Sequence, residues 1–167
     1  MNRQGQSCSS TSRVFVHQNL QNAVNEELVK QAEALPIGIP WIDGNEVGPV
    51  VSDKQLERVK GFIASAHEDG AALLTGGGVP TDPALANGHF IEPTVFGNVT
   101  PEMRIGHQEI FGPVMSVLAW DDYEDMLAKA NGVMYGLTAT IVTNDFKMAM
   151  ETAERIEAGY VWVNAQG

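Results

Sequence analysis

The sequence is short of several residue types, and each shortage argues against a class of protein. A single cysteine, Cys8, rules out an internal disulfide, which fits a reducing compartment, and we expect a cytoplasmic protein. Ten lysines and arginines stand against 21 aspartates and glutamates. The resulting net charge of -11 argues against nucleic acid and anionic membrane surfaces as partners. No apolar run is long enough to cross a bilayer, so we expect no membrane association.

Binding motifs for nucleotides and metals are also missing. The glycine-rich stretches 38–48 and 75–78 contain neither the dinucleotide fingerprint GxGxxG nor a P-loop, so both are predicted to be turns. The four histidines lie far apart and offer no paired spacing, and we expect no metal site. DDYED (121–125) lacks the glycine and distal glutamate of an EF-hand loop. Asp121 or Asp122 is therefore expected to cap a helix.

The order of strand-like and helix-like segments predicts the fold class. In the last third, strand and helix patterns alternate over 114–120, 122–131, 137–143, 146–158 and 160–164. This order predicts parallel strands joined by right-handed crossovers. A chain of 167 residues is long enough to bury a real core in one domain. We therefore expect an α/β protein.

Earlier segments add a strand, two helices and an extended stretch, expected at 12–18, 19–35, 52–70 and 89–96. Glu26 and Lys30 are predicted to pair on the exposed face of the first helix. Ser52 and Gln55 have the spacing of a capping box at the start of the second. Pro93 indicates an edge strand or a bulge in the extended stretch.

Cys8 lies among small and polar residues in RQGQSCSS (3–10). A lone cysteine is more often a small buried hydrophobe. Reactive thiols, in contrast, lie in partly exposed, polar surroundings that stabilise the thiolate. The residues alone leave both interpretations open.

Two other segments have a similar ambiguity. In HQEIFGPV (107–114), Glu109 and Phe111 are either a solvated carboxylate and a packed ring, or a carboxylate that binds sugar hydroxyls beside a ring that packs on a flat group. Ligands of α/β sheets collect at the carboxyl ends of the strands, which places Asn164 near a possible site. Asn164 is equally a candidate for a structural hydrogen bond.

Together these segments resemble the NAD(P)-dependent aldehyde dehydrogenase family. GQSCSSTSR (5–13) is similar to its catalytic-cysteine signature, and EIFGPV (109–114) is similar to its E-x-F-G-P motif. Weaker agreements follow in the same order over nearly the whole chain: GPVVS (48–52), GHFIEPTVF (88–96), AN followed by YGL (130–137) and AGYVWVN (158–164). The resemblance implies a three-layer open sheet, mostly parallel, with flanking helices.

The resemblance also implies a reaction and roles for single residues. Cys8 is the implied nucleophile, which attacks an aldehyde carbonyl to give a thiohemiacetal; hydride then leaves to NAD or NADP, and water hydrolyses the thioester to a carboxylic acid. Glu109 is implied to bind the nicotinamide ribose, and Phe111 to pack beside the nicotinamide. The implied residues of the aldehyde pocket are Ser7, Ser9, Asn164 and Ala165.

Family members also contain a Rossmann-type cofactor domain, a glutamate general base and an oxyanion-hole asparagine upstream of the cysteine motif. None of these is found in residues 1–167, so we expect a single partial catalytic domain that does not turn over aldehyde by itself. The complete enzyme is expected to be a homo-oligomer. Two alternatives are a cofactor-independent thiol esterase that uses Cys8, and a non-enzymatic remnant or binding module that keeps the fold.

Overall fold

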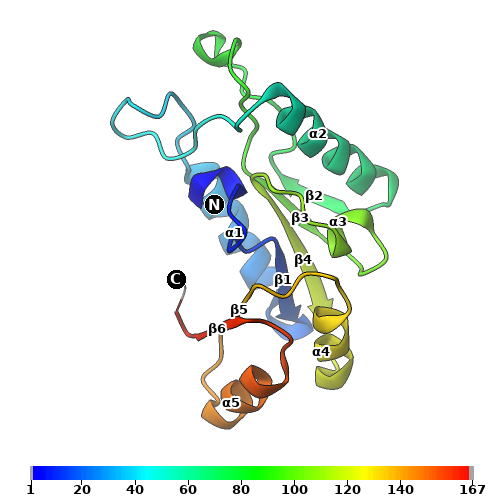
Figure 1. The fold of residues 1–167 in the computed structure, drawn as a ribbon. Helices are drawn as coiled ribbons and strands as arrows, with labels where there is room; N and C mark the ends of the chain where they lie inside the picture. The colour runs from blue at the N-terminus through cyan, green and yellow to red at the C-terminus, as the bar shows by residue number, and fades with distance from the viewer. Residues whose placement is uncertain (1, 166–167) are drawn as a thin grey trace. The chain divides into compact units, whose positions relative to one another are not determined.

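The computed structural model describes residues 2–165, which fall into two compact units, Met1–Ala119 and Trp120–Gly167 (Figure 1). The first unit contains a four-stranded sheet and the second a two-stranded sheet. Within residues 2–165, no helix is both long enough and apolar enough to span a membrane.

The four-stranded sheet of the first unit is mixed. Its strands are β1 (Arg13–His17), β2 (Ala72–Thr75), β3 (Thr94–Gly97) and β4 (Val114–Trp120), in the order β1-β4-β3-β2. β3 and β4 run parallel, whereas β2 runs antiparallel to β3. The expected α/β class is confirmed, with β2 as an antiparallel edge.

Helices cover both faces of this sheet, which gives three layers. They are α1 (Gln21–Ala34) on one face, and α2 (Asp53–Glu68) with the short α3 (Arg104–His107) on the other. Consecutive strand residues point to opposite faces. Val95 accordingly packs in the cluster that contains Ala32 of α1, and Phe96 packs in the cluster that contains Phe62 of α2. Three short 3-10 helices complete the unit: η1 (Asn2–Gly5), η2 (Gln18–Leu20) and η3 (Pro83–Leu85).

The start of α2 is as predicted, but only half of the capping box forms. Ser52 Oγ accepts a hydrogen bond from the backbone N–H of Gln55 at 3.2 Å. In a complete box the Gln55 side chain would return this bond to Ser52. Its amide instead donates to the carbonyls of Ile110 and Phe111. The N-terminus of α2 is therefore capped by Ser52 alone, and the Gln55 side chain binds the segment that contains Ile110 and Phe111.

The predicted ion pair on α1 forms with a different glutamate. Lys30 Nζ lies 3.5 Å from Glu27 Oε2, not beside Glu26 as expected. Positions three and four residues apart are both neighbours on a helix, so spacing alone does not choose between them. Glu27 is also held by Gln31, whose amide donates to Glu27 Oε1 at 2.7 Å. This hydrogen bond, followed by the charge of Lys30, lowers the pKa of Glu27.

The expectation of an edge strand at Pro93 is wrong. Pro93 immediately precedes β3, which is an inner strand between β4 and β2. Proline has no N–H to donate, and just outside the ladder this lack removes no strand hydrogen bond. The ladder begins at Thr94, whose N–H donates to the Pro113 carbonyl at 2.8 Å. A shift in register does occur opposite β3, between Leu73 and Thr75 of β2.

The second unit contains α4 (Tyr123–Asn131), β5 (Thr138–Ile141), α5 (Phe146–Arg155) and β6 (Tyr160–Val163). β5 and β6 run parallel, with α5 as the connection. Asp122 caps α4 by accepting from the Asp125 N–H at 2.8 Å, as predicted. The elements expected from 114 to 164 all form: β4 pairs within the four-stranded sheet of the first unit, and β5 pairs with β6 in the second.

Candidate active site

Cys8 lies on a tight turn over residues 7–10, closed by the Ser10 N–H, which donates to the Ser7 carbonyl at 3.0 Å. The cysteine is free and exposed, so its interpretation as a buried core residue is wrong. On either side of it, the hydroxyls of Ser7 and Ser9 lie 3.1 Å apart and form a hydrogen bond. The Ser9 N–H lies 3.4 Å from Ser7 Oγ. The turn therefore carries an exposed thiol, and the serines before and after it in sequence bond to each other.

The cysteine turn is in backbone contact with the EIFGPV segment. Gly5 has a φ of +67°, and a Cβ added to it would lie 1.9 Å from the carbonyl oxygen of Gly112. Gly112 is equally confined on its own side, where a Cβ would lie 2.5 Å from Cγ2 of Val59. Glycine is therefore needed at position 5 for the contact with Gly112, and at position 112 for the packing against Val59. The two motifs singled out in the sequence are thereby brought together.

A third segment, 48–52, is tied to the cysteine turn by two glutamines. Gln6 Oε1 accepts from the Val51 N–H at 2.8 Å. Gln4, with its amide oriented to satisfy both partners, accepts from the Gly48 N–H at 2.9 Å and donates to the Arg3 carbonyl at 3.1 Å. Gln4 and Gln6, both before Cys8, therefore attach the turn to this segment.

The loop of residues 109–111 is held from α2. Arg58 Nη2 donates to the Glu109 carbonyl at 2.6 Å, and Gln55 Nε2 donates to the carbonyls of Ile110 at 3.3 Å and Phe111 at 2.7 Å. Phe111 has a φ of +60°, which is uncommon for a residue with a side chain. The half-buried Glu109 carboxylate has no hydrogen-bond or ion-pair partner among residues 2–165.

Asn164, the residue after β6, makes a structural contact in the second unit. Its φ is +53°; its Oδ1 accepts from the Thr143 N–H at 3.0 Å, and its Nδ2 donates to the Thr143 carbonyl at 2.9 Å. Ala165 follows it and is exposed. Whether these two residues join a pocket with Ser7 and Ser9 stays a prediction.

Two other features bear on the chemistry available to the site. Within residues 2–165, no group of three or more histidine, cysteine or acidic side chains is arranged to hold a metal ion. At the end of the cysteine signature, burial lowers the pKa of Arg13, whose guanidinium lies 5.4 Å from the centroid of the Phe15 ring.

Sequence reasoning missed the two α2 residues that hold the loop. The sequence predicts a role for Gln55 in the helix cap alone, and it predicts no role for Arg58. The only available signal is their spacing of three residues, which places both side chains on one side of α2.

Comparison with known proteins identifies the family of the chain that carries the cysteine turn and the E-x-F-G-P loop. The sequence model of the aldehyde dehydrogenase family matches residues 1–167. An alpha-ketoglutarate semialdehyde dehydrogenase from Haloferax volcanii is 46% identical over 160 residues, which are 96% of this chain and 33% of that protein. A betaine aldehyde dehydrogenase from Brucella anthropi is 42% identical over 161 residues, again 96% of this chain and 33% of the relative.

Solved structures agree with the sequence relatives. The NAD+ complex of aldehyde dehydrogenase from Bacillus cereus matches with a TM-score of 0.93 at 40% identity, over 98% of this chain and 33% of that one. Mycobacterium tuberculosis aldehyde dehydrogenase complexed with NAD+ matches with a TM-score of 0.94 at 36% identity, over 98% of this chain and 34% of that one. The chain thus spans about a third of the length of these relatives. By sequence and by structure, it belongs to the aldehyde dehydrogenase family.

Proposed function

We propose that this chain is the thiol-bearing part of an NAD(P)-dependent aldehyde dehydrogenase that oxidises an aldehyde to a carboxylic acid. The observation that carries the proposal is the backbone contact of Gly5 with Gly112, which joins the exposed Cys8 turn to the loop with Glu109 and Phe111. Family membership supports the reaction class. The names of the relatives support an aldehyde as the substrate.

Cys8 is the proposed nucleophile. After the thiol has lost its proton, the Cys8 thiolate attacks the carbonyl carbon: a C–S bond forms, and the electron pair of the C=O π bond moves onto oxygen. The Cys8 N–H donates to no group within residues 2–165, so it is available to the developing oxyanion. Loss of one such donor typically lowers kcat about a hundredfold or more.

Glu109 and Phe111 fit a nicotinamide cofactor. The Glu109 carboxylate has no partner among residues 2–165, so its oxygens are available to accept hydrogen bonds from ribose hydroxyls. The Phe111 ring is half-buried, which leaves part of it for contact with a flat group. NAD(P), when bound, supplies the acceptor for the hydride that leaves the Cys8 adduct. The NAD+ complexes of two structural neighbours support this choice.

Substrate choice is proposed to depend on the residues around the thiol. Ser7 and Ser9 flank Cys8, and their linked hydroxyls present a polar surface to an incoming aldehyde. Asn164 and Ala165 are proposed to complete the pocket. Because both amide atoms of Asn164 already bind Thr143, its proposed contribution is to hold the chain that carries Ala165.

The test separates three outcomes by mass spectrometry and a cofactor-dependent rate. We expect a stoichiometric adduct on Cys8 after addition of an aldehyde or an activated ester, and none on Cys8→Ala. In a full-length enzyme that carries this chain, we expect NADH or NADPH formation that requires Cys8. Ester hydrolysis without cofactor dependence would support the thiol esterase instead, and absence of any adduct would support a binding module.

The 167-residue chain alone is expected to form the adduct without turnover. Residues 1–167 contain no dinucleotide fingerprint, and the sequence offers no identified base to activate the deacylating water. NADH formation by this chain alone, dependent on Cys8, would contradict that expectation.

A further inference from the structure

We propose that Gln55 and Arg58 of α2 are positioning residues that fix the conformation of the loop 109–111, and through it the placement of Glu109 and Phe111. The effect on catalysis rests on the proposed function. The effect on the loop is a property of this chain alone.

The first argument is the direction of three consecutive carbonyl groups. In an extended strand, successive carbonyls point to opposite sides. Those of Glu109, Ile110 and Phe111 all accept from α2, at 2.6, 3.3 and 2.7 Å respectively. The donors, Gln55 and Arg58, are three residues apart and therefore lie on one side of the helix. The loop backbone is shaped to meet that side.

The second argument is the backbone conformation of Phe111. Its φ of +60° lies in the left-handed region, which is unfavourable for a residue with a Cβ atom. Such a conformation persists only where surrounding contacts hold it. The shorter of the two Gln55 bonds, at 2.7 Å, is to the carbonyl of this same residue. The hydrogen bond from Gln55 thus offsets the conformational cost of the left-handed backbone at Phe111 itself.

The third argument is that neither donor is required for the helix. Ser52 Oγ caps α2 without help from the Gln55 side chain. The Arg58 guanidinium lies 4.9 Å from the centroid of the buried Phe62 ring, which also has Arg104 over it at 4.0 Å. The same Arg58 guanidinium thus stacks on Phe62 and donates to the Glu109 carbonyl. The side-chain hydrogen bonds of Gln55 and Arg58 thus go to the loop 109–111.

The consequence concerns the Glu109 carboxylate. No group among residues 2–165 binds it, so its placement depends on the backbone to which it is attached. Arg58 holds that backbone through the Glu109 carbonyl. Loosening the loop therefore moves the carboxylate and the Phe111 ring without removing either from the protein.

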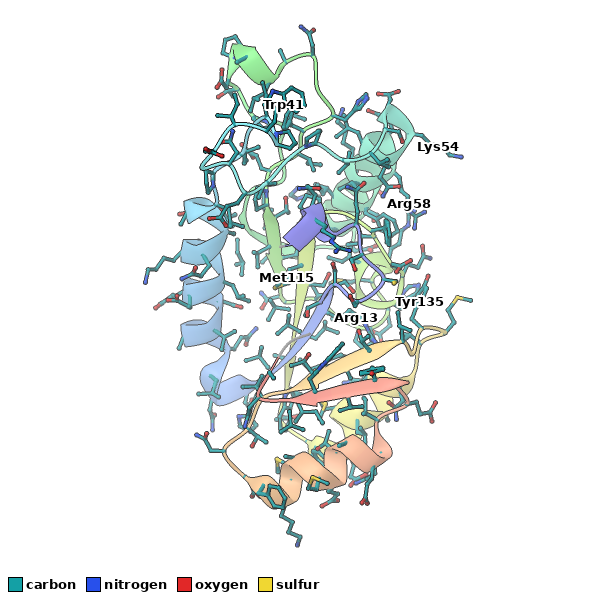
Figure 2. All side chains as sticks on the ribbon, turned by 60° about the vertical axis from the view of Figure 1, so that its left-hand side comes forward. Arg13, Trp41, Lys54, Arg58, Met115 and Tyr135 are labelled. Carbon is teal, nitrogen blue, oxygen red and sulfur yellow. The ribbon has the colours of Figure 1, made fainter. Side chains whose placement is uncertain are left out.

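The first experiment uses NMR of the isotope-labelled 167-residue chain. Gln55→Glu keeps the size of the side chain but, as a carboxylate, has no N–H to donate. We expect the coupling constant and carbon shifts of Phe111 to lose their left-handed values in this variant, and Gln55→Ala to behave alike. Lys54→Ala is the matched control: Lys54 is the preceding residue, is exposed, and has no partner among residues 2–165 (Figure 2).

For Arg58, the comparison is between Arg58→Met and Arg58→Lys. Methionine keeps much of the apolar stem of arginine but has no N–H donor. Lysine keeps the positive charge and an ammonium group that can donate to the Glu109 carbonyl. We expect the methionine variant to shift the amide signals of residues 109–111 and the lysine variant to restore part of the native shifts. The helical carbon shifts of α2 should persist in both, and α2 amide shifts should change only near residue 58, where the stacking on Phe62 is altered. Native Phe111 signals in Gln55→Glu and Arg58→Met would overturn the proposal.

The second experiment measures cofactor handling in a full-length enzyme that carries this chain. We expect Gln55→Glu to raise the KM for NAD(P) and to slow the hydride step, with a combined loss in kcat/KM of about tenfold, or roughly 1.4 kcal/mol. The rate at which an activated ester acylates Cys8 should stay unchanged. A shift of Phe111 in the NMR spectra with unchanged cofactor kinetics would retain the positioning of the loop and remove Glu109 and Phe111 from the cofactor site. That result would contradict the proposed function separately.

Discussion

Gly5 and Gly112 touch through their backbones, at a distance that no side chain on Gly5 permits. Gly5 lies three residues before Cys8, and Gly112 follows Phe111 directly. The turn with the proposed nucleophile and the loop with the proposed cofactor residues are more than a hundred positions apart in sequence, and they meet at these two glycines. Several expectations about stability and reactivity depend on this contact.

Gly5→Ala is expected to lower the free energy of unfolding by about 2–4 kcal/mol. The left-handed φ of +67° contributes about 1 kcal/mol, and the overlap with Gly112 O contributes about 1–3 kcal/mol more. Denaturant unfolding of the 167-residue chain measures the change. Gly44→Ala is the control, because Gly44 has a φ of +93° and nothing within 4 Å of a Cβ. Equal losses in the two variants would show that the contact with Gly112 contributes nothing.

Cys8 is expected to alkylate in the folded chain at least as fast as in the unfolded chain. The thiol is exposed on a polar turn, so the fold does not shield it from iodoacetamide. Mass spectrometry should find one label per chain in native buffer and none in Cys8→Ser. Labelling that needs denaturant would contradict the exposed turn.

Glu109→Gln is expected to weaken cofactor handling about tenfold, or roughly 1.4 kcal/mol, in a full-length enzyme that carries this chain. The amide still accepts one hydrogen bond but loses the charge of the carboxylate, so the loss is partial. The hydride-transfer rate and the acylation of Cys8 by an activated ester are measured side by side. Hydride transfer equal to that of the parent enzyme would remove Glu109 from the cofactor site.

Gly61→Ala is expected to stabilise the chain by about 0.5–1 kcal/mol. Gly61 lies inside α2, is exposed, and has nothing within 4 Å of a Cβ. Alanine gains helix propensity there at no steric cost. Gly70→Ala is the opposite control, since Gly70 also has open space but a φ of +84°. A thermal scan should therefore move in opposite directions for the two variants.

The ion pair of Glu124 with Arg155 is expected to make the second unit sensitive to acid. The hydrogen bond from Arg155 lowers the pKa of Glu124 and raises that of Arg155. A lowered pKa favours the charged form in the folded state, so the stabilisation is complete above the ordinary glutamate pKa of about 4.3 and is lost as the pH falls through the folded-state value.

A carbon-detected NMR titration of Glu124 measures this effect directly. The Arg155→Met variant should raise the Glu124 pKa toward the ordinary value. Salt should do the same in part, because the pair is exposed. A midpoint unchanged by both would argue that the pair does not persist in solution.

The sequence predicted those elements whose signals are local. Ser52 and Asp122 are capping residues beside apolar repeats, and α2 and α4 begin where these side chains indicate. Each of these caps depends on residues within one or two turns of the chain. For Cys8 the residues left a buried and an exposed thiol both open, and the structure decides for the exposed one.

Features that depend on distant partners were not predictable in the same way. β4 and β5 both have strand patterns, but which neighbour each strand pairs with is decided by the sheet as a whole. The capping-box spacing gave Gln55 a local partner, and the competing carbonyls of residues 110 and 111 lie far along the sequence. The proposed roles of Glu109 and Phe111 come from the family resemblance, whereas the hydrogen bonds that Gln55 and Arg58 donate to their loop are seen only in the structure.

The cysteine turn and the loop 109–111 are joined through the main chain of Gly5 and Gly112. The residues that hold the turn in place are therefore different from the residues that surround the thiol. Ser7 and Ser9 project from the turn without taking part in the contact of Gly5 with Gly112. A combinatorial library at positions 7 and 9 can therefore vary the groups around the thiol while the attachment of the turn stays constant. Under the proposed function, such a library would test how these two positions affect the choice of aldehyde, with the contact of Gly5 with Gly112 left unchanged.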